Sequence, residues 1–225
     1  MRSVMNLAAW EQKGVTIVID PGHGGIDGGA ESKGGICEKD INLAISLALR
    51  DLAEEAGWRV IMTREKDEGL YEEGKGSIRS KKVEDIKKRQ KIINESDADA
   101  AISIHLNSYP SQSVKGAQAF YSKSSDEGKV IAEMIQERIR EDVDPENERQ
   151  ALTKDDIAIM KNNSFPLVLV ECGFLSNDLE VELLQEKEYQ KKLAKCIFDS
   201  LKEYFVAMGK LEVAEIQVIE GALTE

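Results

Sequence analysis

The sequence is poor in cysteine, proline and aromatic residues, and it has no long hydrophobic run. Its 225 residues include three cysteines, four prolines and 5% aromatic residues. An odd number of cysteines without Cys-x-x-Cys spacing excludes both a disulfide framework and a thiolate zinc site, although a pair between Cys37 and Cys172 is left open. No apolar run reaches the roughly 18 residues that a transmembrane helix needs.

Positive charge is also scarce. Thirty Lys and Arg residues against 42 Asp and Glu residues leave a formal net charge of −12. Nucleic-acid binding needs a basic face, and the one basic stretch, residues 79–91, is interrupted by Glu84 and Asp85 and is interpreted as a solvated helix face. Residues 69–76 nearly spell a phosphate-binding loop, but Gly76 stands where a magnesium-binding Ser or Thr is required. We therefore expect neither a nucleic acid nor a nucleotide as partner.

The length is typical of one domain. The first 14 residues contain an apolar stretch that is too short for a secretory signal. Residues 209–225 alternate weakly and are compatible with a strand, a helix or disorder. We expect an N-terminal extension at 1–14, one folded domain at 15–208 and a tail at 209–225, with any native signal or membrane anchor absent from this chain.

Strands and helices alternate along the chain. The β-branched run at 15–19, closed by Asp20-Pro21-Gly22, is typical of a buried strand that ends in a turn. Apolar spacing predicts strands at 15–19, 58–62, 98–105, 116–121 and 166–171, and helices at 39–55, 78–95, 125–142 and 181–208. This alternation predicts an α/β fold: a single three-layer domain with a mainly parallel twisted sheet and helices on both faces.

The chain has only two histidines, and both lie at ends of predicted strands. His23 follows the first strand and His105 closes the third, while Glu171 ends the last. Glu38 opens the first helix after a loop with six glycines. Ligands of α/β proteins bind at the carboxyl ends of strands. A single histidine there is more often a hydrogen-bonded loop residue, but two histidines beside two glutamates indicate a site.

Two histidines and one carboxylate are the ligands of a catalytic zinc ion that keeps a fourth position open. A further carboxylate can act as a general base and then as a general acid. The composition of the cluster therefore predicts a zinc hydrolase. The glycines between His23 and Glu38 either form simple turns or allow the backbone to approach a polymer, and both readings stay open.

The motifs VIDPGHGGIDGGA, EKDINL, Thr63-Arg64, SIHLNS and VLVECGFLSN together resemble the zinc-dependent N-acetylmuramoyl-L-alanine amidases of the Amidase_3 type, over residues 15–205. The resemblance implies hydrolysis of the amide between N-acetylmuramic acid and L-alanine in peptidoglycan. It implies one Zn²⁺ with the ligands His23, Glu38 and His105. It also implies that Glu171 activates water.

Two further residues carry weaker expectations. Asn107, in the His-x-Asn position of the motif, is expected to shape the site without binding metal. Arg64 could position a carboxylate of the stem peptide, although a structural ion pair is the favoured role.

The segment 151–184 resembles the CwlD-like sporulation and germination branch of the family, which acts on spore cortex and leads to muramic δ-lactam. This resemblance implies an extracytoplasmic location, in the cell wall or the forespore envelope. The chain has no wall-binding module, and an acidic protein gains no general attraction to an anionic polymer. We therefore expect an activating or recruiting protein partner. The alternative is a catalytically silent member of the family that binds the wall or activates an amidase.

Overall fold

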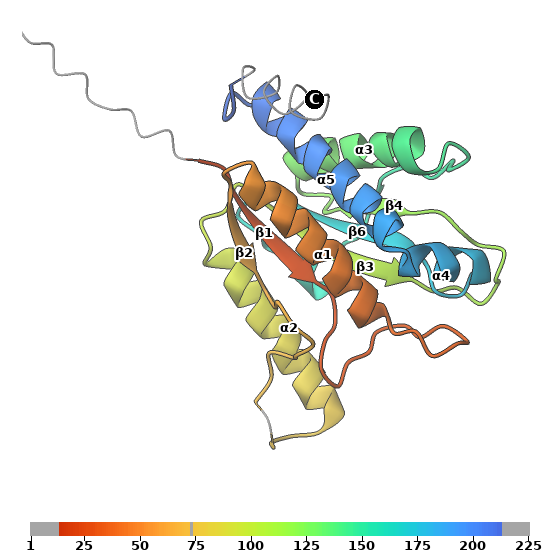
Figure 1. The fold of residues 1–225 in the computed structure, drawn as a ribbon. Coiled ribbons are helices and arrows are strands. Elements are labelled where there is room, and N and C mark those ends of the chain that lie inside the picture. The colour runs from red at the N-terminus through yellow and green to blue at the C-terminus, as the bar shows by residue number, and fades with distance from the viewer. Residues whose placement is uncertain (1–13, 73, 213–225) are drawn as a thin grey trace, which may run out of the picture.

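The computed structural model describes residues 14–72 and 74–212 of the chain, whose strands and helices alternate (Figure 1). In chain order the elements are β1 (Thr16–Pro21), α1 (Glu38–Glu55), β2 (Arg59–Met62), α2 (Ile78–Asn94), β3 (Ala100–Asn107), β4 (Gln118–Tyr121), α3 (Asp126–Arg138), the π-helical turn η1 (Ile139–Val143), β5 (Leu152–Thr153), the 3₁₀ turn η2 (Ala158–Met160), β6 (Leu167–Phe174), α4 (Asp178–Gln185) and α5 (Lys187–Ala207).

In the described part of the chain the strands form one six-stranded sheet in the order β2-β1-β3-β6-β4-β5. Neighbouring strands run parallel, except that β4 lies antiparallel to β6. The predicted mainly parallel sheet is therefore confirmed. Parallel strands place their carboxyl ends at one edge, which is where the candidate residues were expected to meet.

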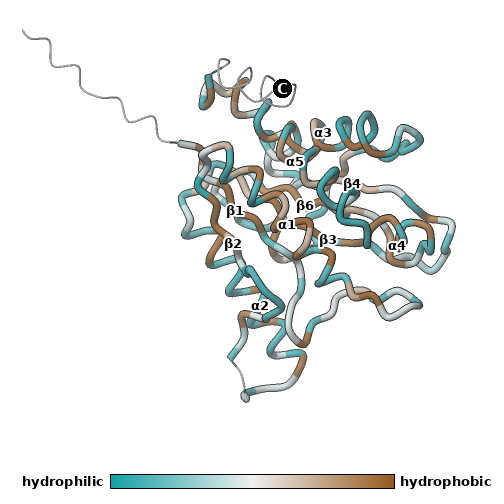
Figure 2. The backbone as a smooth tube through the Cα atoms, in the orientation of Figure 1, coloured by the Kyte–Doolittle hydropathy of each residue, from teal (hydrophilic) through white to brown (hydrophobic). Residues whose placement is uncertain are grey.

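Helices cover both faces of this sheet, as predicted. The larger core lies under α1, α3 and α5 and includes Ile17, Ile45, Ile104 and Leu201. The smaller core, on the opposite face, joins Val18, Ala101 and Leu169 to Ile93 of α2 and to Met160 of η2. Figure 2 shows hydrophobic residues along the central strands, whereas α2 is largely hydrophilic.

Two strands continue further toward their carboxyl ends than the sequence indicated. β3 continues past His105 to Asn107, and β6 continues past Glu171 to Phe174. β3 and β6 remain paired over this extension, with a shift in register between His105 and Asn107, as in a β-bulge. His105 and Glu171 therefore lie within paired strands and not at their ends, and they are direct Cα partners across the β3–β6 ladder.

Four other features differ from the prediction, answer a question that it left open, or lie outside the described residues. The predicted helix at 125–142 is α3 followed by the π-helical turn η1. The stretch after it contains the short strand β5, which local propensity did not indicate. Cys37, Cys172 and Cys196 are all free, so the pairing left open does not form. The predicted extension at 1–14 and the tail at 209–225 lie mostly outside the described residues.

None of the helices within residues 14–72 and 74–212 is both long enough and apolar enough to span a bilayer.

Candidate active site

A tight turn after β1 brings His23 against His105. The amide of Gly22 donates to the carbonyl of Ile104 at 2.9 Å, which ties the turn to β3. A Cβ on Gly22 would lie 2.3 Å from Cε1 of His105, so only glycine lets the two segments approach this closely. His23 itself has a φ of 63°, a conformation uncommon outside glycine that is concentrated at functional sites.

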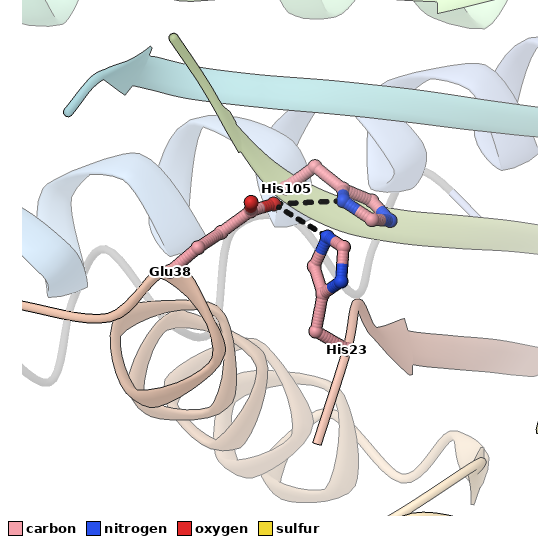
Figure 3. A group of neighbouring side chains, drawn as sticks. All are labelled: His23, Glu38 and His105. Atoms are coloured by element: carbon pink, nitrogen blue, oxygen red, sulfur yellow. Dashed lines mark hydrogen bonds and ion pairs between the residues drawn. The ribbon is translucent and has the colours of Figure 1, made fainter. Parts of the chain in front are cut away.

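Glu38, the first residue of α1, reaches the same point from the other side. Its Oε1 lies 3.2 Å from Nε2 of His23 and 2.9 Å from Nδ1 of His105 (Figure 3). The amide of Leu106 also donates to Oε1, at 3.0 Å, and the amide of Ala30 donates to Oε2, at 2.8 Å. These donors hold the carboxylate between the two imidazoles.

The glycine loop has to fold back for this contact to form. Gly29 has a φ of +71°, and a Cβ there would lie 2.5 Å from Oε2 of Glu38 and 2.7 Å from Cδ2 of His23. The amide of Glu38 donates to the carbonyl of Ala30 at 2.9 Å, which closes the loop onto the start of α1. This position supports both readings of the glycines, since Gly29 provides a positive φ and a close approach at once.

Asp27 orients His23. Its Oδ2 lies 3.0 Å from Nδ1 of His23, so that Nε2 faces Glu38 and His105. Lys82 of α2 contacts the other carboxylate oxygen at 2.7 Å. Burial by itself would raise the pKa of Asp27, but the hydrogen bonds from His23 and Lys82 outweigh it and hold the pKa well below its usual range. A carboxylate on the outer nitrogen of a ligating histidine is a common partner in metal sites.

The same contacts change the proton affinity of His23 and Glu38. Burial would lower the pKa of His23, but the hydrogen bonds to Asp27 and Glu38 prevail and raise it to about 9. Burial would raise the pKa of Glu38, but the hydrogen bonds with His105 and His23 hold it far below its ordinary value. Without a metal ion, the cluster therefore carries a proton on His23 and a negative charge on Glu38 at neutral pH.

A buried ion-pair network connects the turn that carries His23 to α2. Arg89 of α2 donates to Asp20 at 2.7 Å, to Asp85 at 2.5 Å, and to the carbonyls of Pro21 and His23. Arg89 and Asp20 are almost completely buried, and removing one partner of such a pair would leave an uncompensated charge. The network couples α2 rigidly to the backbone of His23.

The side chain of Arg64 is hydrogen-bonded to the backbone of the surrounding segments. Its guanidinium is buried and donates to the carbonyls of Pro21, Gly22 and Lys39 at 3.0, 3.0 and 2.8 Å, and to that of Lys66 at 3.1 Å. These contacts tie the His23 turn to the start of α1. They favour a role in holding the backbone over a contact with a carboxylate of the stem peptide. The acceptors of these hydrogen bonds are carbonyl groups and not the carboxylate of a structural ion pair.

Glu171 lies beside the cluster on the next strand. As the Cα partner of His105 on a parallel neighbour, it points to the same side of the sheet. Its carboxylate is buried, and Oε1 lies 3.0 Å from Nζ of Lys154. Oε2 is buried and accepts no hydrogen bond from any described residue. A buried carboxylate oxygen without a protein donor is rare, and a catalytic role, an ordered water molecule or an ion each accounts for such an atom.

Asn107 lies two residues beyond His105, after the register shift. Its Oδ1 accepts from the amide of Ser108 at 2.8 Å, and its carbonyl accepts from the amide of Leu175 at 2.9 Å. These contacts join the end of β3 to the segment that follows β6. They agree with a residue that shapes the rim of the site.

His23, Glu38 and His105 form a cluster that could hold a metal ion. One ligand atom from each residue lies within 4.8 Å of the other two. His23 lies 15 positions before Glu38 in the chain, and His105 lies 67 positions after it, yet the three side chains converge on one point (Figure 3). These three residues are the ligands that the sequence motifs predict.

Comparison with known proteins agrees with this architecture. The sequence profile of the Amidase_3 family, described as N-acetylmuramoyl-L-alanine amidase, matches residues 17–203. The chain belongs to this family. It is an N-acetylmuramoyl-L-alanine amidase, and the resemblance of its motifs is confirmed.

Several relatives of this amidase are similar over most of their length. The germination-specific N-acetylmuramoyl-L-alanine amidase of Bacillus subtilis is 42% identical over 196 residues, which cover 87% of this chain and 82% of that protein. The structure of the CwlD amidase from Clostridioides difficile, in complex with the GerS lipoprotein, matches with a TM-score of 0.84 and 45% identity and covers 86% of this chain and 99% of that one. An N-acetylmuramoyl-L-alanine amidase from Clostridium difficile 630 matches with a TM-score of 0.72 and 28% identity, over 85% and 97% of the two chains.

Sequence reasoning did not find three residues of the amidase site. Asp27 is not among the residues that the sequence predicts for the site, although its spacing of four from His23 was a usable signal. Arg89 was part of a stretch interpreted as solvated, whereas its side chain is buried. Lys154 gave no signal, because nothing local relates β5 to β6.

Proposed function

We propose that this amidase is zinc-dependent, that His23, Glu38 and His105 bind one Zn²⁺, and that Glu171 transfers the protons of the reaction. The convergence of the three ligand atoms carries the proposal. Two imidazole nitrogens and one carboxylate oxygen are typical donors of catalytic zinc. The glycines at 22 and 29 leave no room for a Cβ against these donors, which also suits a packed metal cluster.

The chain's own groups have distinct roles in amide hydrolysis. A zinc ion bound here would supply Lewis-acid polarisation of the amide carbonyl and would acidify water. Oε2 of Glu171 accepts a proton from the attacking water while the water oxygen bonds to the amide carbon. The same oxygen then donates that proton to the nitrogen of L-alanine as the C–N bond breaks. Asp27 holds His23 in place throughout, because it contacts Nδ1, the ring nitrogen that faces away from Glu38 and His105.

The proposed substrate is spore-cortex peptidoglycan, in which removal of the stem peptide allows muramic δ-lactam to form. Identity of 42% with a germination-specific amidase supports this. The proposed location is extracytoplasmic, in the cell wall or the forespore envelope. The alternative is a catalytically silent member of the family that binds the wall or activates an amidase, and the presence of Glu171 together with the cluster of His23, Glu38 and His105 favours the active enzyme.

The decisive experiment measures zinc content and amidase activity of the same preparation. Zinc-loaded protein incubated with purified cortex sacculi should release new N-terminal L-alanine and generate peptide-free muramic acid. Protein stripped of metal by a chelator should be inactive and should recover on addition of Zn²⁺. Zinc-loaded protein that released no L-alanine would refute the enzymatic reading and leave the silent one.

A protein partner is the second part of this proposal. A relative at 45% identity was solved in complex with a lipoprotein, which supports a partner that recruits or activates the enzyme. Affinity capture from sporulating cells should recover one protein in stoichiometric amount. Its absence, together with full activity of the isolated chain on cortex, would argue against a partner.

Zinc uptake by the metal-free enzyme is expected to release protons at neutral pH. The pKa of His23 is raised from 6.5 to about 9, so the residue is protonated at pH 7.5, and a metal ligand must be neutral. The charged His23–Glu38 pair stabilises the metal-free protein fully below pH 6.5, and this stability is lost as pH rises through about 9. Calorimetric titration of Zn²⁺ at pH 7.5, in buffers of different ionisation enthalpy, should therefore return about one proton per zinc. Zero released protons would contradict the protonation state assigned to His23.

A further inference from the structure

Lys154 reaches the candidate active site from the far edge of the sheet. It follows β5 directly, and its amide donates to the carbonyl of Tyr121 at 3.0 Å, which continues the pairing with β4. The next residue, Asp155, accepts from the hydroxyl of Ser122 and the amide of Lys123, both at 3.0 Å. The backbone of Lys154 is therefore anchored on both sides.

The side chain of Lys154 crosses β4 to arrive at β6. Its Nζ lies 4.5 Å from the centroid of the Phe120 ring and 3.0 Å from Oε1 of Glu171. The lysine side chain is 24% exposed and that of Glu171 is 9% exposed. An ammonium group over an aromatic face and beside a buried carboxylate has little freedom to move.

This contact makes the two oxygens of Glu171 unequal. Oε1 is held by Lys154, whereas Oε2 is buried without a donor among the described residues. The last torsion of a glutamate side chain is broad, so the plane of a free carboxylate would take many orientations. A donor at a fixed place restricts that plane, so that one oxygen bonds Lys154 and the other is left for proton transfer.

We propose that Lys154 is a positioning residue for amide hydrolysis, and that it orients the carboxylate of Glu171 by holding Oε1. The inference rests on the proposed role of Glu171 as the group that transfers protons. Lys154 itself touches neither the substrate nor the reacting atoms. By fixing the carboxylate, it keeps Oε2 available first to receive the proton of the attacking water and then to return it to the leaving amine.

The test compares Lys154→Met with Lys154→Arg in the full, zinc-loaded chain. Methionine keeps the apolar stem over Phe120 but removes the donor, and is expected to lower kcat by roughly 10- to 100-fold while KM changes less than about twofold. Arginine restores a charged donor and should recover most of the rate. Zinc content should equal that of the wild type in both variants, because Lys154 touches none of the proposed ligands.

Lys195→Met is the matched control, since Lys195 forms an ion pair with Asp199 at 2.7 Å on the exposed side of α5. It should leave kcat unchanged. The inference is overturned if Lys154→Met keeps kcat within about twofold of the wild type, or if Lys154→Arg is as slow as Lys154→Met. Glu171→Gln distinguishes failure of the proposed function from failure of this inference. An active Glu171→Gln variant refutes the role of Glu171. An inactive Glu171→Gln variant together with a fast Lys154→Met variant refutes only the positioning role of Lys154.

Discussion

Replacing Glu171 with glutamine is expected to lower kcat/KM on cortex peptidoglycan by about 10²- to 10⁴-fold, the range that a general acid–base group contributes. Glutamine keeps the size of the side chain and can still accept a hydrogen bond from Lys154. It cannot take up the proton of the attacking water at the second position, because the amide group is not basic. Zinc content should stay at the wild-type level, since Glu171 lies outside the His23, Glu38 and His105 cluster. The measurement pairs release of N-terminal L-alanine with elemental analysis.

Glu180→Gln is the control for this substitution. Counted over the whole residue, Glu180 and Glu171 are both 7% exposed. However, the carboxylate of Glu180 accepts from the amides of Gly116 and Phe174 at 3.0 and 2.9 Å, and therefore has a structural role. Glu180→Gln should lower the melting temperature and leave the activity of the folded protein near that of the wild type. A Glu171→Gln variant with more than about a tenth of the wild-type kcat/KM would remove Glu171 from the mechanism.

Replacing His105 with alanine should abolish metal binding and activity together. The substitution removes one of the three proposed ligands and also a hydrogen-bond partner of Glu38 at 2.9 Å. Loss of an outer-shell partner already costs roughly 10- to 100-fold in metal affinity, so loss of a ligand should exceed about 100-fold. Competition between the variant and a zinc chelator of known affinity measures the change.

The control is Asn107→Ala, on the same strand beyond the register shift. Its side chain bonds the amide of Ser108, so this variant should keep its zinc. The comparison of His105→Ala with Glu171→Gln also tests whether β3 carries a metal ligand and β6 carries the general base. If His105→Ala and Glu171→Gln lost zinc equally, Glu171 would be a ligand and the assignment of the base would be wrong.

The parts of the fold that depend on local pattern were predictable. The β-branched run of β1 and the helical spacing of α1 each lie within one stretch of sequence, and both are confirmed. β5 was not predictable, because its two residues become a strand only by pairing with Phe120 and Tyr121 of β4. The extension of β3 past His105 likewise depends on the register shift against β6 and on no property of β3 alone.

The candidate site divides in the same way. His23, His105 and Glu171 could be selected because chemically distinctive side chains follow or close apolar runs. Arg89 could not be assigned, since the same basic helix presents some side chains to solvent and this one to Asp20. Asp27 was adjacent to the motif, but only the contact at 3.0 Å between its Oδ2 and Nδ1 of His23 identifies its role.

The sequence by itself determined which side chains could bind a metal ion, which strands carry them along the chain, and the turn around Gly22. Periodicity, propensity and turn formation are properties of a few consecutive residues. Only the tertiary structure decided how those groups face one another. Glu38 is placed between two imidazoles by a folded loop, and one oxygen of Glu171 is held by Lys154 from across β4. The orientation of a carboxylate depends on donors that long-range packing brings to it, and no local pattern specifies such contacts.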